Sequence, residues 1–527
     1  MIQGAEPHVL AVDLGTSGPK AAVISLAGRI VATARAEVET IHLPDEGVEQ
    51  DPEAVWRAVK TALGEALRKA GVPARDVRAV ICSSQYSSIV PVDRDGRPTM
   101  NMVLWLDRRG KKHRLEKLPH YPKRSDTPLQ MLQWLRVHGL PPVDGGISLT
   151  HMRFIKYARP EIYARTACFL EPMDFIAMRL CGRATANQCT AFMSLAMDNR
   201  RLNVTAYDAR LLRYAGIDAE KLPELVPLNA RLGPVRPDVA AELGLAPDTQ
   251  VVTGLNDTQS GGLATGAFRG AHGGLSVGSS SVMITHVPFK RTDVRHAILS
   301  MPSPVPDTWF VMAENGLAGS TLAHFLESLV YPRDAFGELA VGDPYAMLQR
   351  AVDETPPGSG GVLFLPWLGG SLAPAADARM RGGFLNLSAA TTRSHLARAV
   401  LEGVAMNLRW LKDPVEKFAK RSFSHFLFYG GGAESPAWSQ IMADVLDAPI
   451  HQMDNPQYAT CLGAGLLAFE RLGLLAFDDF SQRVTIREIY EPNPAHRARY
   501  DEMSAQLVQA FKATQPIFRR LNSARRA

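Results

Sequence analysis

Short apolar runs with strand character alternate with amphipathic helical segments along most of this chain. At the N-terminal end, HVLAVDLG, KAAVISL and RIVATARAEV are β-prone runs separated by SGP and AGR, and they predict an antiparallel meander. From Asp51 to Gly71, apolar residues recur at helical spacing between an acidic start and a glycine stop, which predicts an amphipathic helix. A buried strand is expected at RAVICSSQ, followed by a turn at DRDG and a second strand at MVLWLD.

The pattern is mainly helical from about Pro128 to Asn199, where PEIYARTACFL and PMDFIAMRLCG are helix candidates. Strand character returns with VVTGL (251–255), and GGLATGA then predicts the start of a small-residue helix. The next segment, GGLSVGSSSVMITHVP, is a strand, a Gly-Ser turn and a strand, and weakly repeats VDLGTSGPKAAVIS. This repeat predicts two related halves that face each other across a cleft. ETPPGSGG (354–361) is expected to be a surface loop, because strand-like VLFLPWL follows directly.

Composition limits the class of protein without defining its activity. A chain of 527 residues is expected to form two or more domains, and 46% apolar with 21% charged residues is ordinary for a soluble protein. A net charge of +5 is too dilute to indicate nucleic-acid binding. The five cysteines are scattered and lack a CxxC pair, which favours a reducing compartment over disulfides or structural zinc. The N-terminus has no signal-peptide pattern and no apolar run reaches about 20 residues, so we expect a cytoplasmic protein without a membrane partner.

The segment GLNDTQSGGLATGA places one acidic side chain, Asp257, among small residues at an expected domain junction. An acid between Gly254 and Gly261, at the end of a buried strand, is positioned to meet a substrate rather than to fill a core. Two strand-then-glycine turns elsewhere in the chain are suited to phosphate binding. Together these features predict phosphoryl transfer to a hydroxyl, with Asp257 as the base.

The first of these turns is DLGTSG. Gly15 allows close backbone approach, and Thr16 and Ser17 offer hydroxyls and exposed N–H groups to anionic oxygens. A Walker A sequence is absent, and taken alone the motif also fits a plain β-turn. Asp13, at the end of an apolar strand, needs a partner, and Mg²⁺ held through water is a natural one. Lys20 is placed to reach a phosphate, although a solvated lysine fits the sequence equally well.

Two further glycine motifs are weaker. The turn Gly278-Ser279-Ser280 gains its interest from its similarity to the first turn. In FLFYGGGAESPAWSQIMADVLDAPI, Gly430 and the two glycines after it join a strand to a helix. Such a junction lets a flat ring or a ribose approach the backbone, and the helix N-terminus favours negative charge. A tight strand-to-helix turn without a ligand is an equally good interpretation.

Taken together, five motifs make the chain resemble the FGGY carbohydrate kinases over nearly its whole length. They are DLGTSG, LWLDRR, GLNDTQSGGLATGA, RGGFLNLSAATTRSHLARAVLEGVAMNL and YGGGAESPAWSQIMADV. The resemblance implies an α/β fold with two actin-like (ribonuclease H-like) domains and a cleft between them. It also implies phosphorylation of sugars or polyols with ATP and Mg²⁺. We assign residues 1–265 to the domain with the sugar site and first phosphate turn, and residues 266–527 to the ATP-binding domain.

The resemblance also implies roles for individual residues. Asp257 would be the catalytic base and Asp13 the carboxylate of the magnesium site. The ATP site would include Thr16, Ser17, Lys20, Ser279, Gly319, Gly431, Gly432 and Ala433. The sugar would contact Gln85, Tyr86, Trp105 and Asp257. The partners implied are a small-molecule sugar and ATP, and a homodimer is compatible with the resemblance.

Within the family the chain is most similar to the xylulokinase group, which makes D-xylulose the first choice of acceptor. It departs from that group at Tyr86-Ser87, where Met-His is usual, at Thr258 in place of Asn, and at Ser279 in place of Thr. The first two changes fall in the acceptor pocket and leave another polyol, a hexulose or a signalling sugar as alternatives. A non-catalytic regulator that senses sugar and ATP is a further alternative, which the presence of Asp257 disfavours.

Overall fold

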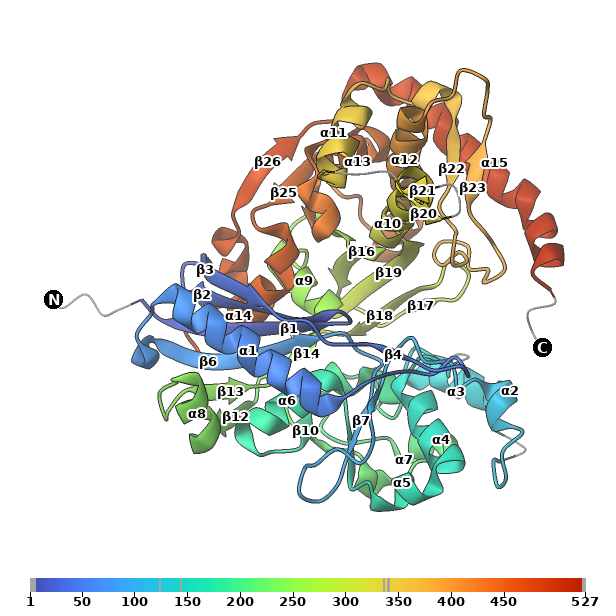
Figure 1. Cartoon of the computed structure of the whole chain (residues 1–527). Coiled ribbons are helices and arrows are strands. Elements are labelled where there is room, and N and C mark those ends of the chain that lie inside the picture. Colours follow the sequence, from blue (N-terminus) through green and yellow to red (C-terminus); the bar gives the residue numbers. More distant parts are fainter. Residues whose placement is uncertain (1–5, 123–124, 143–144, 335–336, 339–341, 524–527) are drawn as a thin grey trace.

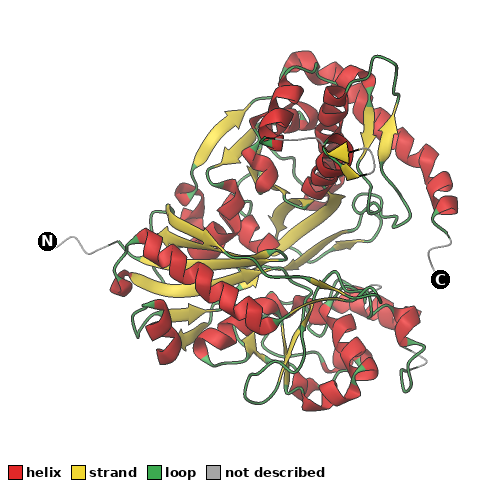
Figure 2. Ribbon diagram, viewed as in Figure 1, coloured by secondary structure: helices red, strands yellow, loops and turns green. Residues whose placement is uncertain are grey.

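Two mixed β-sheets form the framework of the chain, and helices cover their faces (Figure 1, Figure 2). The computed structural model describes residues 6–122, 125–142, 145–334, 337–338 and 342–523. The first sheet has the order β12-β13-β6-β1-β2-β3, with β14 paired to β6 beside this path. Its strands are β1 (His8–Gly15), β2 (Gly18–Ser25), β3 (Ile30–Arg35), β6 (Val77–Ser84), β12 (Arg231–Pro234), β13 (Gln250–Val252) and β14 (Leu255–Asn256).

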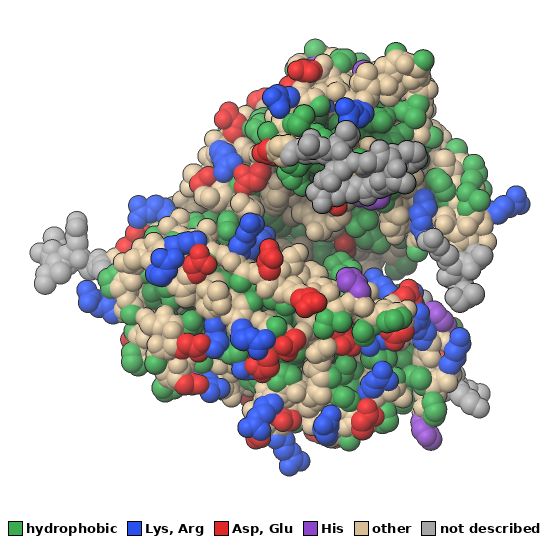
Figure 3. Space-filling model, in the orientation of Figure 1, with side chains coloured by type: hydrophobic (Ala, Val, Ile, Leu, Met, Phe, Trp, Pro, Cys, Tyr) green, Lys and Arg blue, Asp and Glu red, His purple; other side chains and the backbone are tan. Residues whose placement is uncertain are grey.

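The second sheet has the order β17-β18-β19-β16-β15-β24-β25-β26. Its strands are β15 (Gly273–Val277), β16 (Ser280–Val287), β17 (Thr292–Asp293), β18 (Ile298–Pro302), β19 (Trp309–Leu317), β24 (Phe426–Tyr429), β25 (Ile450–Met453) and β26 (Ile486–Tyr490). We call each sheet with the helices packed on it a lobe, the first lobe and the second lobe. Figure 3 shows the molecular surface hollowed between them.

The two sheets share one topology. In the first sheet, β1 pairs antiparallel with β2 and parallel with β6, while β2 pairs antiparallel with β3 and β6 parallel with β13. In the second, β15 pairs antiparallel with β16 and parallel with β24, while β16 pairs antiparallel with β19 and β24 parallel with β25. The weak sequence repeat therefore corresponds to two equivalent hairpins, β1–β2 and β15–β16, at equivalent places in the two sheets.

Both faces of the first sheet are buried, which explains its nearly continuous apolar strands. Alternate residues of β1 face opposite sides: Leu10 and Val12 belong to one core, and Val9 and Ala11 to another. The core that contains Leu10 and Val12 is completed by α1 (Pro52–Ala70), α6 (Pro172–Cys181) and α8 (Pro237–Leu243). Helix α1 confirms the predicted amphipathic helix: Asp51 caps its N-terminus, and Gly71 ends it in the left-handed conformation at φ 62°.

Two helices, α9 (Asp257–Thr265) and α14 (Ala459–Arg471), pack against each other on the other face of the first sheet. The contact is close: a Cβ on Gly463 of α14 would lie 1.8 Å from the carbonyl oxygen of Ser260 in α9. Helix α14 also contacts β1, β2 and β6, although it follows most of the second sheet in the sequence. The division at residue 265 stays a prediction, and in space α14 belongs against the first lobe.

The remaining helices and the smaller sheets lie around these two lobes. The helices are α2 (Lys112–Leu115), α3 (Pro128–Val137), α4 (Ser148–Ala158), α5 (Pro160–Arg165), α7 (Ala209–Ala215), α10 (Gly319–Phe325), α11 (Pro344–Asp353), α12 (Arg393–Ala419), α13 (Pro436–Leu446) and α15 (Arg497–Leu521). The smaller sheets comprise β4 (Ile41–His42), β5 (Val48–Gln50) and β8 (Met102–Val103), β7 (Val90–Val92) and β9 (Cys168–Leu170), β10 (Thr185–Ala186) and β11 (Glu224–Leu225), β20 (Arg333–Asp334) and β21 (Gly337–Glu338), and β22 (Leu363–Leu365) and β23 (Gly383–Leu385).

Four expectations from the sequence need correction. The MVLWLD strand is only β8, because the chain turns where the N–H of Asp107 donates to the carbonyl of Leu104. The predicted helix PEIYARTACFL stops at Arg165, and CFL forms strand β9 beside β7. GGLATGA contains the end of helix α9, which already begins at Asp257. ETPPGSGG is only partly a surface loop, because Ser359 is fully buried.

Candidate active site

Asp257 is the first residue of helix α9, at the end of strand β14. Asn256 caps this helix by accepting a hydrogen bond from the N–H of Gln259, so the position of Asp257 is fixed by the helix start. Asp257 Oδ1 accepts hydrogen bonds from the N–H and hydroxyl of Thr258, at 2.6 and 3.1 Å. Burial, together with the nearby charges of Asp13 and Glu314, raises the pKa of Asp257 to about 7. This carboxyl group is therefore poised to exchange a proton near neutral pH.

Asp13 lies near the end of β1, beside Ser83 of β6 and opposite Lys20 of β2. Its carboxylate is buried, and Oδ2 accepts a hydrogen bond of 2.7 Å from the hydroxyl of Thr460 in α14. The other oxygen, Oδ1, is buried without a hydrogen-bond partner. A buried carboxylate oxygen without a donor is suited to a hydrated cation. In the described ranges no group of three or more His, Cys, Asp or Glu side chains is arranged to hold a metal ion.

Three of the predicted site residues form one hydrogen-bonded cluster. Gln85 Oε1 accepts from the Thr16 hydroxyl at 2.6 Å and from Trp105 Nε1 at 3.1 Å. The amide nitrogen of Gln85 is buried and has no acceptor. Trp105 is 37% exposed, and its backbone N–H is fixed by the Ser88 hydroxyl. The cluster therefore presents an aromatic wall beside an unused amide donor.

Tyr86, the residue after Gln85, connects this cluster to the second lobe. Its hydroxyl donates to Met312 Sδ of strand β19, at 3.2 Å. Burial raises the pKa of the Tyr86 phenol, and the charges of Glu314 and Asp257 add to this rise. Tyr86 thus lies between the Gln85 loop and the β19 strand, close to the proposed base.

The first phosphate turn joins β1 to β2, with Ser17 exposed at its tip. The Thr16 hydroxyl of this turn donates to Gln85, so it points toward the cluster of Gln85 and Trp105. Lys20 Nζ donates to the Gln457 carbonyl of the other half of the chain, at 3.3 Å. Its predicted contact with a phosphate stays a prediction.

The second phosphate turn joins β15 to β16 and meets the start of helix α10. The carbonyl of Gly278 accepts from the N–H of Gly319 at 2.9 Å, and the carbonyl of Ser279 accepts from the N–H groups of Ala318 and Ser320. A Cβ on Gly319 would lie 2.4 Å from the Gly278 oxygen, so glycine is required for this contact. The structure therefore brings Ser279 and Gly319 together, while their predicted contact with ATP stays a prediction.

The glycine triplet lies beside this second turn. Gly430 has φ 92°, and a Cβ on Gly432 would lie 2.5 Å from Val277, the residue before the turn. A Cβ on Gly431 would meet no atom within 4 Å, so this residue borders open space. Ala433 is fully buried, and its carbonyl accepts from Gln452. Of the three residues predicted here for the ATP site, Gly431, Gly432 and Ala433, Gly431 has the open position in this structure.

Two residues of the site carry no local sequence signal and were not predicted. Thr460 reaches Asp13 from a helix that is distant in the sequence. Glu314 lies near Asp257 and Tyr86 because it follows Met312, which contacts Tyr86, by two residues on strand β19. Neither residue belongs to a glycine turn or a strand end of the kind that identified Asp257 and Asp13.

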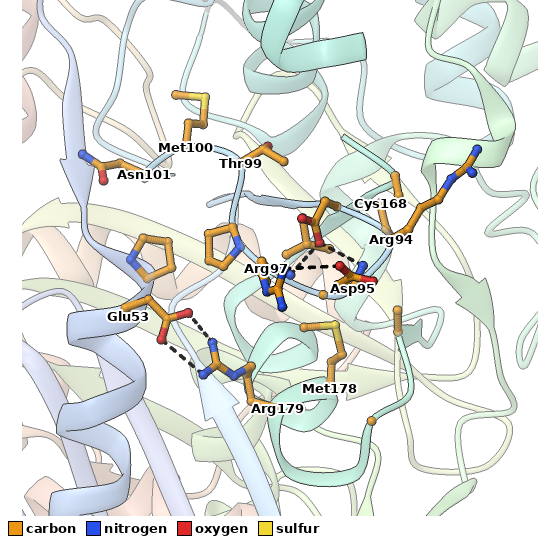
Figure 4. A pocket seen from close by; sticks show the side chains of 18 of the residues that line it. Glu53, Arg94, Asp95, Arg97, Thr99, Met100, Asn101, Cys168, Met178 and Arg179 are labelled. Atoms are coloured by element: carbon orange, nitrogen blue, oxygen red, sulfur yellow. Dashed lines mark hydrogen bonds and ion pairs between the residues drawn. The ribbon is translucent and has the colours of Figure 1, made fainter. Parts of the chain in front are cut away.

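A hollow of about 960 Å³ lies elsewhere on the first lobe (Figure 4). The start of α1, the loop from Val92 to Asn101 and the end of α6 form its wall, and none of the predicted site residues lines it. Two charged pairs lie in its lining, Arg179 with Glu53 and Arg97 with Asp95. No helix in the described part of the chain is long and apolar enough to cross a bilayer.

Comparison with known proteins identifies the family. Residues 8–264 match the N-terminal domain of the FGGY family of carbohydrate kinases, and residues 273–470 match its C-terminal domain. A xylulose kinase of Bacillus subtilis (strain 168) is 27% identical over 469 residues, which cover 88% of this chain and 87% of that protein. A gluconokinase of the same strain is 26% identical over 491 residues, or 90% of each chain.

A solved structure shows the same fold. The ligand-bound xylulose kinase of Lactobacillus acidophilus superposes with a TM-score of 0.83 at 22% identity, over 98% of this chain and all of that one. The expected α/β fold of two actin-like (ribonuclease H-like) domains is thereby confirmed. The chain belongs to the FGGY family of carbohydrate kinases and is an ATP-dependent carbohydrate kinase.

Proposed function

We propose that this kinase transfers the γ-phosphoryl group of ATP to the terminal hydroxyl of a ketopentose, with D-xylulose as first choice. Asp257 is the proposed general base. The similarity to xylulose kinases supports the acceptor. The hydrogen-bonding groups of Gln85 and the aromatic wall of Trp105 suit a molecule with several neighbouring hydroxyls.

The observation that carries this proposal is the environment of Asp257. A general base is most effective when its pKa lies near the working pH, and burial raises the pKa of Asp257 to about 7. An ordinary exposed aspartate would be a much weaker base. Proton transfer from the attacking hydroxyl to Asp257 is expected to contribute about 10²–10⁴-fold to the rate. The remainder comes from alignment of the two substrates, because phosphoryl transfer has a loose transition state.

Asp13 is the proposed carboxylate of the magnesium site. Its buried, unpartnered Oδ1 fits a metal-bound water, and the Thr460 hydroxyl orients the other oxygen. When bound, Mg²⁺ would neutralise charge on the phosphate oxygens. The two glycine turns of the β1–β2 and β15–β16 hairpins are the proposed phosphate contacts, and Gly431 is the proposed border of the adenosine.

A coupled assay of ADP release tests this function over a panel of pentuloses, hexuloses, polyols and aldonates. We expect the highest kcat/KM for D-xylulose, and no acceptor-dependent ADP release from Asp257→Ala. Activity on no pentulose would overturn the proposed acceptor, and wild-type kcat in Asp257→Ala would overturn the proposed base. Tyr86→Met should change the ranking of acceptors more than the KM for ATP, and an unchanged ranking would remove Tyr86 from the pocket.

A sugar acid is the second candidate acceptor, because the gluconokinase and the xylulose kinase of Bacillus subtilis are almost equally similar to this chain. Their identities to it are 26% and 27%. A polyol, a hexulose or a signalling sugar remains within the range of the proposed chemistry. A homodimer stays a prediction, which light scattering on the purified protein tests directly.

A further inference from the structure

Glu314 is a carboxylate in the wall of the site that no step of the proposed reaction uses. It lies on strand β19 of the second lobe and pairs with Val282 of β16. Among the described residues, no side chain or backbone group donates a hydrogen bond to its carboxylate, and no cation pairs with it. A half-buried carboxylate without a donor is costly unless something outside the chain supplies one.

The alternation of strand β19 directs Glu314 toward the acceptor pocket. Residues Phe310, Met312 and Glu314 share one face of the strand, and Ala313 between them is buried on the other. Phe310 contacts α9, since a Cβ on Gly262 would lie 2.5 Å from its ring. Met312 accepts the hydrogen bond from Tyr86. Glu314 is the next residue on this face, beyond the contact with Tyr86.

The electrostatic effects of Glu314 on its neighbours also place its carboxylate beside the acceptor pocket. The negative charge of Glu314 raises the pKa of Tyr86 and that of Asp257, so its carboxylate lies near both groups. Burial raises the pKa of Glu314 itself. None of the residues assigned to the acceptor pocket carries a positive charge: Gln85, Tyr86 and Trp105 are neutral, and Asp257 is acidic.

The backbone of this strand end is held in place. The carbonyl of Glu314 accepts from the N–H of Ala373 at 3.0 Å. The side chain of the next residue, Asn315, is buried and donates to the carbonyls of Ala373 and Asn407. The same strand leads into Gly319 at the second phosphate turn. Hydrogen bonds of the Glu314 carbonyl and of the Asn315 side chain therefore fix the position of Glu314 relative to the second phosphate turn.

We propose that Glu314 selects the acceptor: its carboxylate accepts a hydrogen bond from a hydroxyl of a neutral sugar or polyol and repels sugar acids. The inference rests on the proposed function, because it assumes that the pocket around Asp257 binds the acceptor. A carboxylate on the substrate would meet both Glu314 and Asp257, and like charges brought together at a binding site strongly disfavour the wrong ligand. A hydroxyl would instead supply the donor that Glu314 lacks.

The test compares wild type with Glu314→Gln, which keeps the shape of the side chain and removes its charge. We expect kcat/KM for the best neutral acceptor to fall by about 10-fold or more, because a hydrogen bond to a charged carboxylate is replaced by a weaker one to a neutral amide oxygen. The KM for ATP should stay within about twofold, and the ratio of kcat/KM for D-gluconate to that for the neutral acceptor should rise by about 10-fold. The acid limb of the pH–rate profile should move to lower pH, because Asp257 loses a neighbouring charge.

Glu488→Gln is the matched control, since Glu488 is an exposed glutamate on the edge strand β26 of the same sheet. Its kinetics should equal those of wild type. Glu314→Asp provides a second variant that keeps the charge: it should still reject D-gluconate while its KM for the neutral acceptor rises. Circular dichroism and thermal unfolding of each variant verify that the fold is intact.

Three results would overturn the inference. They are an unchanged ratio of acceptors in Glu314→Gln, a rise in the KM for ATP without a change for the acceptor, and a wild-type preference for D-gluconate. If the wild-type enzyme prefers a hexulose or a polyol, the ketopentose proposal fails. The role of Glu314 is then measured with that acceptor, so the two failures are distinguishable.

Discussion

Replacing Asp257 by asparagine should lower kcat by about 10²–10⁴-fold and, at alkaline pH, stabilise the fold. Asparagine keeps the size of the side chain, and its carbonyl can still accept the hydrogen bonds from Thr258. It removes a negative charge that burial and the neighbouring Asp13 and Glu314 disfavour. The same charge that makes Asp257 a suitable base therefore opposes folding.

The size of this destabilisation follows from the change in the pKa of Asp257 on folding. The pKa of Asp257 rises from 3.8 to about 7 on folding. Because the folded pKa is the higher one, the destabilisation is absent below about pH 4, grows as the pH rises, and is complete above about pH 7. At about 1.4 kcal/mol per pKa unit, its upper limit is about 4 kcal/mol. Asp257 is partly exposed, and solvent screening reduces the expected effect to about 1–2 kcal/mol.

Urea unfolding of wild type and Asp257→Asn at about pH 5 and about pH 8.5 measures this effect. The variant should have the higher midpoint at alkaline pH, and the difference should shrink at acid pH, while kcat falls by about 10²–10⁴-fold. Subtracting the two proteins at each pH cancels the titration of every other group. A variant that is less stable than wild type at both values, or a difference that does not change with pH, would refute this account of Asp257.

Three further predictions follow from the described contacts. Asp13→Asn should lower kcat/KM for Mg-ATP by about 10–100-fold at limiting Mg²⁺. Lys20→Ala should have a smaller effect, because Lys20 Nζ is bound to a carbonyl, and equal wild-type activity of both would remove the metal role of Asp13. The value of kcat/KM should fall tenfold per pH unit below about pH 7, because protonation of Asp257 removes the base, and a flat profile down to about pH 5 would contradict this. Glu402→Ala should destabilise the protein by about 3–5 kcal/mol in urea unfolding, because it leaves buried Arg398 unpaired; a change below about 1 kcal/mol would contradict the importance of this pair.

Features encoded by short stretches of sequence were predictable. Helix α1 has a capping aspartate, an apolar stripe and a terminal glycine within one segment, and the structure contains it as predicted. The two hairpins of the sheets were recognisable from a strand, a glycine turn and a strand. Asp257 stood out because a single acid among small residues has no packing role. Local patterns of this kind require no knowledge of distant contacts.

The errors have a common physical origin. An apolar run such as CFL fits a helix or a strand, and only its partner β7 decides between them. Ser359 is buried because its hydroxyl donates a hydrogen bond of 2.7 Å to the Glu402 carboxylate of helix α12, although the surrounding Pro- and Gly-rich sequence is typical of an exposed loop. Glu314 and Thr460 reach the site through tertiary contacts, so no spacing in the sequence identifies them. The acceptor depends on such contacts and is correspondingly the least predictable feature.

The hydrogen bond between Thr460 and Asp13 joins residues 447 positions apart. During synthesis the first sheet therefore leaves the ribosome long before helix α14 exists to cover the face that contains Val9 and Ala11. Until then that apolar face is open to unwanted association, and the carboxylate of Asp13 has not gained its oriented partner. A chain that stops before helix α14 cannot assemble this site, so ATP would meet a finished site only after synthesis has passed Thr460.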